Sequence, residues 1–152
     1  MSNTDRTGGL HEGTGRGHRT VPHTADLRIE AWGQNREECI AEAVLGLVDS
    51  FAVVAGRLPR GQVRRHLTAG SDEDLLVTVI DEVIYRLDAE GEIPASVAVR
   101  PAPDGGAVVV LEVVPVAEAE IIGAAPKAAS LHDLRCTPDA AGRWACGVTI
   151  DV

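Results

Sequence analysis

The sequence predicts an α+β fold in which two helices pack on one face of a mixed or antiparallel sheet. Two stretches, 35–51 and 71–90, repeat apolar residues with the spacing of amphipathic helices, and several others alternate with the period of strands. The predicted order is strand, helix, strand, helix and then two hairpins. A chain of 152 residues with 45% hydrophobic content can form one ordinary core, so we expect a single two-layer domain over residues 21–152.

The first twenty residues have a different composition from the rest of the chain. They contain five glycines and, beyond the initiator methionine, a single leucine. Such a segment buries too little apolar surface to order itself. We therefore expect residues 1–20 to form a disordered tail in which His11 and His18 are solvated.

The first predicted strand covers residues 23–33 and the last covers 143–152. Both alternate apolar and polar residues, so each has one buried face and one face toward solvent. By this alternation Asp26 and Asp151 point away from the core. If these two strands lie near each other in one sheet, their carboxylates and the terminal carboxylate of Val152 converge.

Each of the two predicted helices has a recognisable start. Asn35 with Glu38 three residues later is typical of a helix N-terminus, and Ser71 followed by three acidic residues is another. Gly91 supplies a stop for the second helix. The predicted apolar stripes are Ile40, Ala43, Val44, Leu47, Val48 and Phe51 in the first helix, and Leu76, Val79, Ile80, Val83, Ile84 and Leu87 in the second.

The remaining strands follow the second helix or lie between the two helices. Residues 62–69 alternate weakly and are predicted to form a strand. The segments 96–100 and 107–114 flank a turn rich in Pro and Gly, which indicates a hairpin. The second of these segments is almost continuously apolar. This favours either a central strand covered on both sides or a strand shared with a second subunit in a homo-oligomer.

The composition argues against several classes of function. A formal charge of −9 disfavours direct, tight binding to nucleic acid, and 3% aromatic content offers no stacking platform for single strands. Three cysteines without a Cys-x-x-Cys pair fit a reducing compartment, and Cys39 and Cys146 are predicted to be small core residues. With no long apolar run and no N-terminal signal pattern, we expect a cytoplasmic protein that does not enter a membrane.

A final hairpin is predicted to pair residues 127–136 with 143–152. It would place Lys127, His132 and Asp133 within a few residues of the chain's end. A site formed by the carboxylates of Asp26, Asp151 and Val152 would offer only oxygen ligands. Such ligands favour Ca²⁺ or Mg²⁺ over Zn²⁺, which prefers Cys or His. The residues themselves leave two interpretations open, a divalent cation site or ordinary aspartates at strand ends.

The same residues also resemble a known family. The sequence His-Thr-Ala-Asp at 23–26, Leu-His-Asp-Leu at 131–134 after Lys127, and a terminal Ile-Asp-Val are similar to the archease family, whose members are associated with RNA-splicing ligase. The resemblance runs from about Pro22 to Val152. One departure is Ala-Ala-Ser-Leu at 128–131, where the family typically has a β-branched residue, Thr and Tyr.

The resemblance implies an archease-like fold and a set of functional residues. Asp26, Asp151 and Val152 would hold a divalent cation, most plausibly Ca²⁺, with Mg²⁺ and Mn²⁺ as alternatives. Lys127 would support the partner ligase or its nucleotide site.

His23, His132 and Asp133 are candidates for orienting the ligands.

The implied function is that of an accessory protein and not of an enzyme. It would activate an RNA-splicing ligase, promoting its guanylylation and turnover in tRNA splicing or RNA repair. The alternative is a general protein-binding or chaperone-like module without catalytic consequence, which an acidic surface also allows. A metal-dependent hydrolase acting alone is disfavoured because no general base can be assigned.

Overall fold

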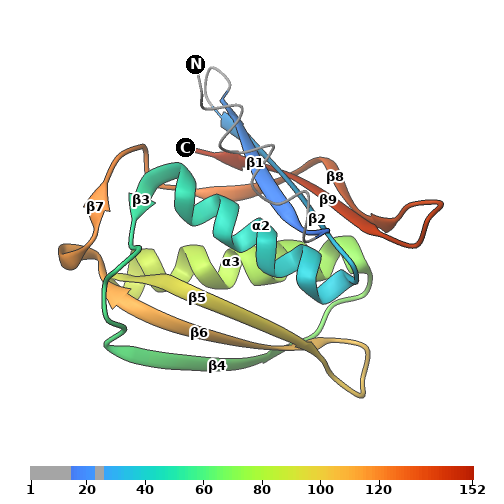
Figure 1. The fold of residues 1–152 in the computed structure, drawn as a ribbon, viewed down its shortest axis with the longest axis horizontal. Coiled ribbons are helices and arrows are strands. Elements are labelled where there is room, and N and C mark those ends of the chain that lie inside the picture. The colour runs from blue at the N-terminus through green and yellow to red at the C-terminus, as the bar shows by residue number, and fades with distance from the viewer. Residues whose placement is uncertain (1–14, 23–25) are drawn as a thin grey trace.

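A computed structural model describes residues 15–22 and 26–152 of the chain. The α+β class predicted from the sequence is confirmed (Figure 1). The elements are β1 (Gly17–Pro22), β2 (Asp26–Gly33), α2 (Arg36–Phe51), β3 (Ala52–Val53), β4 (Gly61–Leu67), α3 (Asp72–Glu90), β5 (Glu92–Pro101), β6 (Ala107–Pro115), the 3₁₀ turn η2 (Val116–Glu118), β7 (Glu120–Ile121), β8 (Ala128–Pro138) and β9 (Trp144–Asp151).

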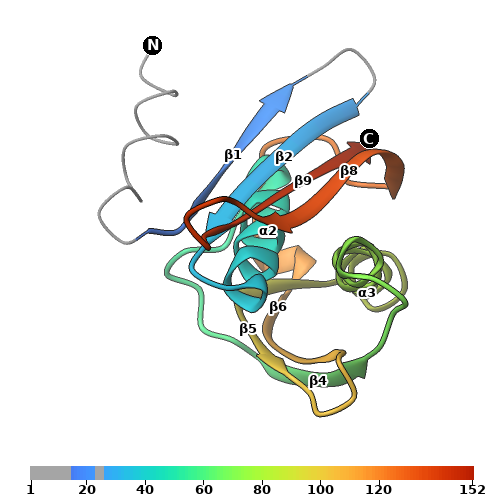
Figure 2. The same ribbon diagram turned by 90° about the vertical axis from the view of Figure 1, so that its right-hand side faces the viewer.

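The strands form two main sheets, where the sequence had suggested one. The first sheet has the order β1-β2-β9-β8, the second has the order β4-β6-β5, and β3 pairs with β7. All of these pairings are antiparallel. Figure 2 shows α2 and α3 lying between the two main sheets, so each helix packs on both.

The burial of α2 explains why a helix on one face of a single sheet was the wrong arrangement. Ten residues of this helix are buried, including Ala41 and Gly46, which lie outside the predicted apolar stripe. Small residues at these positions let a second layer approach the helix closely. A Cβ added at Gly46 would lie 3.1 Å from Ile29 Cγ2 and 3.2 Å from His18 Cδ2, so this side of α2 is covered by the first sheet.

The helix ends agree with the sequence prediction. The Asn35 side chain accepts a hydrogen bond from the Glu38 backbone N–H at 2.8 Å, and the Ser71 hydroxyl accepts one from the Asp74 N–H at 3.1 Å. Gly91 follows α3 in the left-handed conformation, with φ 65°. These contacts satisfy backbone groups that a helix terminus leaves unpaired.

The ordered domain begins before residue 21, which corrects the predicted boundary of the tail. Strand β1 pairs with β2 from the Gly17–Trp32 pair onward. His18 is not solvated, because its ring nitrogens lie 2.8 Å from Glu42 Oε1 and 2.8 Å from Asp49 Oδ2 on α2. Polar contacts therefore fix this strand, and apolar periodicity could not reveal it. The rest of the predicted tail, residues 1–14 with His11, lies outside the described residues.

The three cysteines lie in the core, as predicted for Cys39 and Cys146. Cys136 and Cys146 are register partners across β8 and β9, with their sulfur atoms 3.3 Å apart. All three thiols are buried and reduced. Hydrogen bonding to the Cys136 and Cys39 thiols, together with burial, raises the pKa of the Cys146 thiol. A thiol in this state is a poor nucleophile because the thiolate is the reactive form.

Candidate functional site

The two aspartates singled out from the sequence face each other across neighbouring strands. Asp26 begins β2, Asp151 ends β9, and the two are direct register partners. Residues that stand opposite each other in an antiparallel pair have Cβ atoms about 4.5–5.5 Å apart on the same face of the sheet. Their neighbours Leu27 and Ile150 are buried, so the aspartates lie on the outer face, as the alternation predicted.

Lys127 and Val152 lie at the same end of the sheet. The Lys127 backbone N–H donates a hydrogen bond to the Asp151 carbonyl at 2.8 Å, and the Lys127 side chain is exposed. Val152 follows Asp151 directly, and its side chain packs against the main core. The last hairpin pairs Asp151 with Ala128, within the predicted pairing of residues 127–136 with 143–152.

His132 and Asp133 lie in a bulge of β8 and not beside the aspartates. Four residues, 131–134, stand opposite the single residue Val148 of β9. The bulge is therefore about 10 Å along the strand from Asp151. His132 Nε2 lies 3.2 Å from Asp133 Oδ2, and both side chains are exposed. Asp133 has a positive φ of 55°, which is uncommon for a residue with a side chain and fits its place in a bulge.

His23, the remaining candidate, lies outside the described residues. Within the described parts of the chain, no three His, Cys, Asp or Glu side chains gather as a metal site. At this sheet end the described side chains that could donate oxygen ligands are the carboxylates of Asp26 and Asp151, and Val152 follows Asp151 directly. Carboxylate oxygens in this number fit a hard cation that keeps water ligands, such as Ca²⁺ or Mg²⁺.

The outer face also carries residues that sequence reasoning did not single out. Arg28 follows Asp26 on this face, and its Nη1 donates a hydrogen bond to Thr149 Oγ1 at 3.1 Å. Together with Glu30 and residues 133–135 of the bulge, Arg28 lines an open hollow of about 450 Å³. The signal available in the sequence was the glycine at 147 in the middle of the last strand, because such a glycine often marks a close approach.

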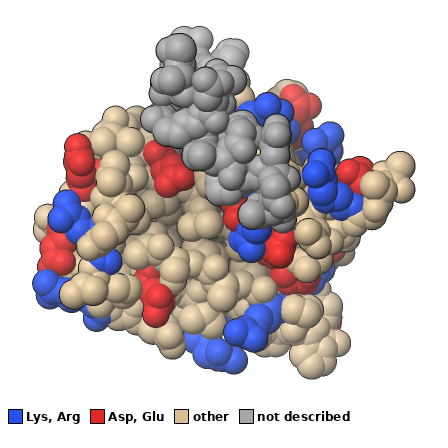
Figure 3. All heavy atoms as spheres, in the orientation of Figure 1, with Lys and Arg blue, Asp and Glu red and all other residues tan. Residues whose placement is uncertain are grey.

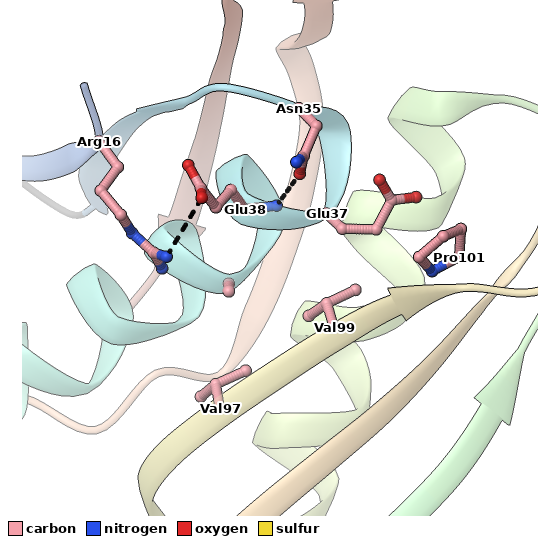
Figure 4. A pocket seen from close by; sticks show the side chains of 8 residues that line it. Arg16, Asn35, Glu37, Glu38, Val97, Val99 and Pro101 are labelled. Atoms are coloured by element: carbon pink, nitrogen blue, oxygen red, sulfur yellow. Dashed lines mark hydrogen bonds and ion pairs between the residues drawn. The ribbon is translucent and has the colours of Figure 1, made fainter. Parts of the chain in front are cut away.

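A second hollow, of about 350 Å³, lies between the start of α2 and strand β5 (Figure 4). Its apolar side is formed by Val97 and Val99. On its polar rim Arg16 is 3.7 Å from Glu38, and Glu37 is held by Arg36 at 2.8 Å. The charges of this hollow are therefore already neutralised within the chain.

On one face of the molecule the surface charge is mixed. On the face shown in Figure 3, acidic and basic side chains of the described residues are interspersed. This arrangement does not form the continuous basic stripe that follows a phosphate backbone. No helix in the described parts of the chain is both long and apolar enough to cross a membrane.

These observations define a small α+β protein with two sheets enclosing two helices and a carboxylate pair at one sheet end. The family model of the Archease protein family matches residues 18–152. Two proteins of Mycobacterium tuberculosis, from strains CDC 1551 / Oshkosh and ATCC 25618 / H37Rv, are each named "Probable protein archease". Each is 48% identical over 140 residues, covering 92% of this chain and 77% of the relative.

The fold has been observed in a solved structure as well. The solution structure of Methanobacterium thermoautotrophicum protein 1598 superposes with a TM-score of 0.70, covering 89% of this chain and 98% of that one, at 18% sequence identity. The chain belongs to the archease family.

Proposed function

We propose that this protein is a metal-binding accessory protein that activates an RNA-splicing ligase in tRNA splicing or RNA repair. Membership of the archease family supports the role of a helper whose partner performs the chemistry. The observation that carries the proposal is the register pairing of Asp26 with Asp151 on the outer face of the first sheet. Two strands far apart in the sequence bring these carboxylates together at the sheet end where Val152 follows.

Asp26, Asp151 and the carboxylate of Val152 would hold the cation, and Ca²⁺ fits the all-oxygen donor set best. When bound, such an ion supplies a concentrated positive charge that can meet phosphate oxygens. The exposed Lys127, whose backbone is tied to Asp151, would add a cation beside it. In the partner complex these groups would help to arrange the nucleotide site and so promote guanylylation and turnover of the ligase.

Calorimetric titration with calcium chloride tests the metal site. The wild type is expected to bind Ca²⁺, and Asp151→Asn is expected to lose that binding because one charged donor becomes a neutral amide. Asp88→Asn is the matched control, since Asp88 is an exposed aspartate at the end of α3. Equal binding by the wild type and Asp151→Asn would remove Asp151 from the site.

Ligation assays with a purified RNA-splicing ligase then test the function. Asp26→Ala should abolish stimulation while leaving the fold intact, because the side chain is on the outer face of the sheet. Lys127→Ala should reduce stimulation while Ca²⁺ binding is retained. If the wild type binds the ligase without changing its rate, the general protein-binding module is the better description.

A further inference from the structure

The side chain of Arg28 lies across the neighbouring strand in a space that only a glycine leaves open. Its guanidinium passes over Gly147 of β9, and a Cβ added there would overlap the Nη2 and Cζ atoms of Arg28. The hydrogen bond to Thr149 holds the guanidinium in this position. A glycine inside a strand often marks a close approach, and here the missing Cβ leaves the space that the Arg28 guanidinium occupies.

A second arginine reaches the same place from the other side. Arg135 of β8 is the register partner of Gly147, as is Glu30 of β2. The bulge at 131–134 ends at Arg135, so the two guanidinium groups border one hollow on the outer face of the sheet. Arg28 is two residues after Asp26 on β2, so along the strand it lies about 7 Å from the Asp26–Asp151 pair on the same face.

Around this hollow the carboxylates have ion-pair partners within the chain, whereas the two guanidinium groups do not pair with a described carboxylate. Glu30 is paired with Arg19 at 2.9 Å, and Asp133 lies 3.2 Å from His132. Over residues 15–22 and 26–152, by contrast, neither Arg28 nor Arg135 is within ion-pair distance of a carboxylate. A planar guanidinium that is held in place and keeps free N–H donors is suited to bidentate binding of an oxyanion.

The shape and surroundings of the hollow restrict the oxyanion. The hollow is open and shallow, whereas sites for small molecules bury most of the ligand surface. The nearby Glu30 and Asp133, and a chain charge of −9, oppose a polyanion such as RNA. A single carboxylate projecting from a protein surface carries one negative charge and can reach a shallow hollow.

We infer that the Arg28–Arg135 hollow is a docking site for an Asp or Glu side chain of the partner protein. This inference rests on the proposed function, in which the partner is the RNA-splicing ligase. The hollow and the Asp26–Asp151 pair face the same way, so one partner surface contacts both. The hollow contributes to the affinity for the partner, and the carboxylate pair is required for the stimulation obtained once the partner is bound.

The test measures the ligation rate of the purified ligase against increasing concentrations of this protein. Arg28→Gln and Arg135→Gln should each raise the concentration for half-maximal stimulation about tenfold, the effect of losing one charge-assisted hydrogen bond, with the maximal rate retained. Arg100→Gln is the matched control, since Arg100 is an exposed arginine on β5 of the other sheet. It should behave as the wild type.

The variant Gly147→Ala tests whether the position of the Arg28 guanidinium matters when its charge is kept. The added methyl group displaces the guanidinium without removing it, so the half-maximal concentration should again rise, while thermal unfolding shows that the variant is folded. Unchanged half-maximal concentrations for both arginine variants would overturn the docking site and leave the proposed function standing.

Absence of any stimulation or binding by the wild type would overturn both proposals. The electrophoretic mobility of the RNA substrate with this protein alone is the last readout. A mobility shift that the wild type causes and Arg28→Gln does not would show that the hollow binds a phosphate, and would overturn the proposed docking of a partner carboxylate.

Discussion

Replacing His18 with Gln should make the stability of the protein depend less on pH. His18 joins β1 to α2 by ring contacts of 2.8 Å to Glu42 and 2.8 Å to Asp49, and its side chain is 11% exposed. Burial alone would lower the pKa of His18. Hydrogen bonds to Asp49 and Glu42 and the charges of these carboxylates outweigh burial and raise the pKa from 6.5 to about 9.

The magnitude follows from the pKa shift. A rise from 6.5 to about 9 corresponds to about 3 kcal/mol of stability from the charged imidazole. We expect about 2 kcal/mol, because Asp49 is 64% exposed and solvent screens its charge. Since the folded-state pKa lies above the unfolded value, this stabilisation is fully present below pH 6.5 and is lost as the pH rises through about 9.

Urea unfolding of the wild type and His18→Gln between pH 6 and pH 10 measures this effect. The difference in the free energy of unfolding should shrink by about 2 kcal/mol across this range, while contributions from other titrating groups cancel in the difference. His66→Gln is the control, because His66 has a comparable 2.8 Å contact to Asp104 but is 53% exposed. A wild-type minus His18→Gln difference that stays constant from pH 6 to pH 10 would refute the assigned role of the charged His18.

Two further predictions concern the core. Leu76→Ala should lower the free energy of unfolding in urea by about 3 kcal/mol because Leu76 is fully buried, whereas Leu58→Ala, at an 80% exposed position, should change it by less than about 0.5 kcal/mol. The raised pKa of the buried Cys146 should make native thiols react slowly with a colorimetric thiol reagent at pH 8, and unfolding in urea should accelerate the reaction; equal rates in both states would contradict the buried cluster.

The elements that the sequence predicted well are those determined by local patterns. The helices 36–51 and 72–90 are capped by Asn35 and Ser71 as expected, because capping and apolar spacing are properties of neighbouring residues. The two-sheet arrangement was not predicted, because the burial of Ala41 depends on a layer contributed by a distant segment. Polar residues that make non-local contacts, such as His18, carry no periodic signal.

In the candidate site, too, residues that follow a strand pattern could be predicted, and residues that depend on non-local contacts could not. Asp26 and Asp151 could be proposed as neighbours because each strand has a clear face and the first and last strands needed only to be adjacent. Arg28 could not be predicted, because the importance of its side chain depends on its register opposite Thr149 and on the missing Cβ of Gly147.

The shared outer face links these two features physically. In the two proposals, the carboxylate pair would hold a cation and the guanidinium hollow an anionic side chain, with roughly 7 Å between successive outward-facing rows. A partner carboxylate that enters the hollow would be repelled by the carboxylates of Asp26 and Asp151, because like charges at this distance interact unfavourably. A cation bound at Asp26 and Asp151 would cancel that repulsion, so calcium binding and partner binding should each strengthen the other.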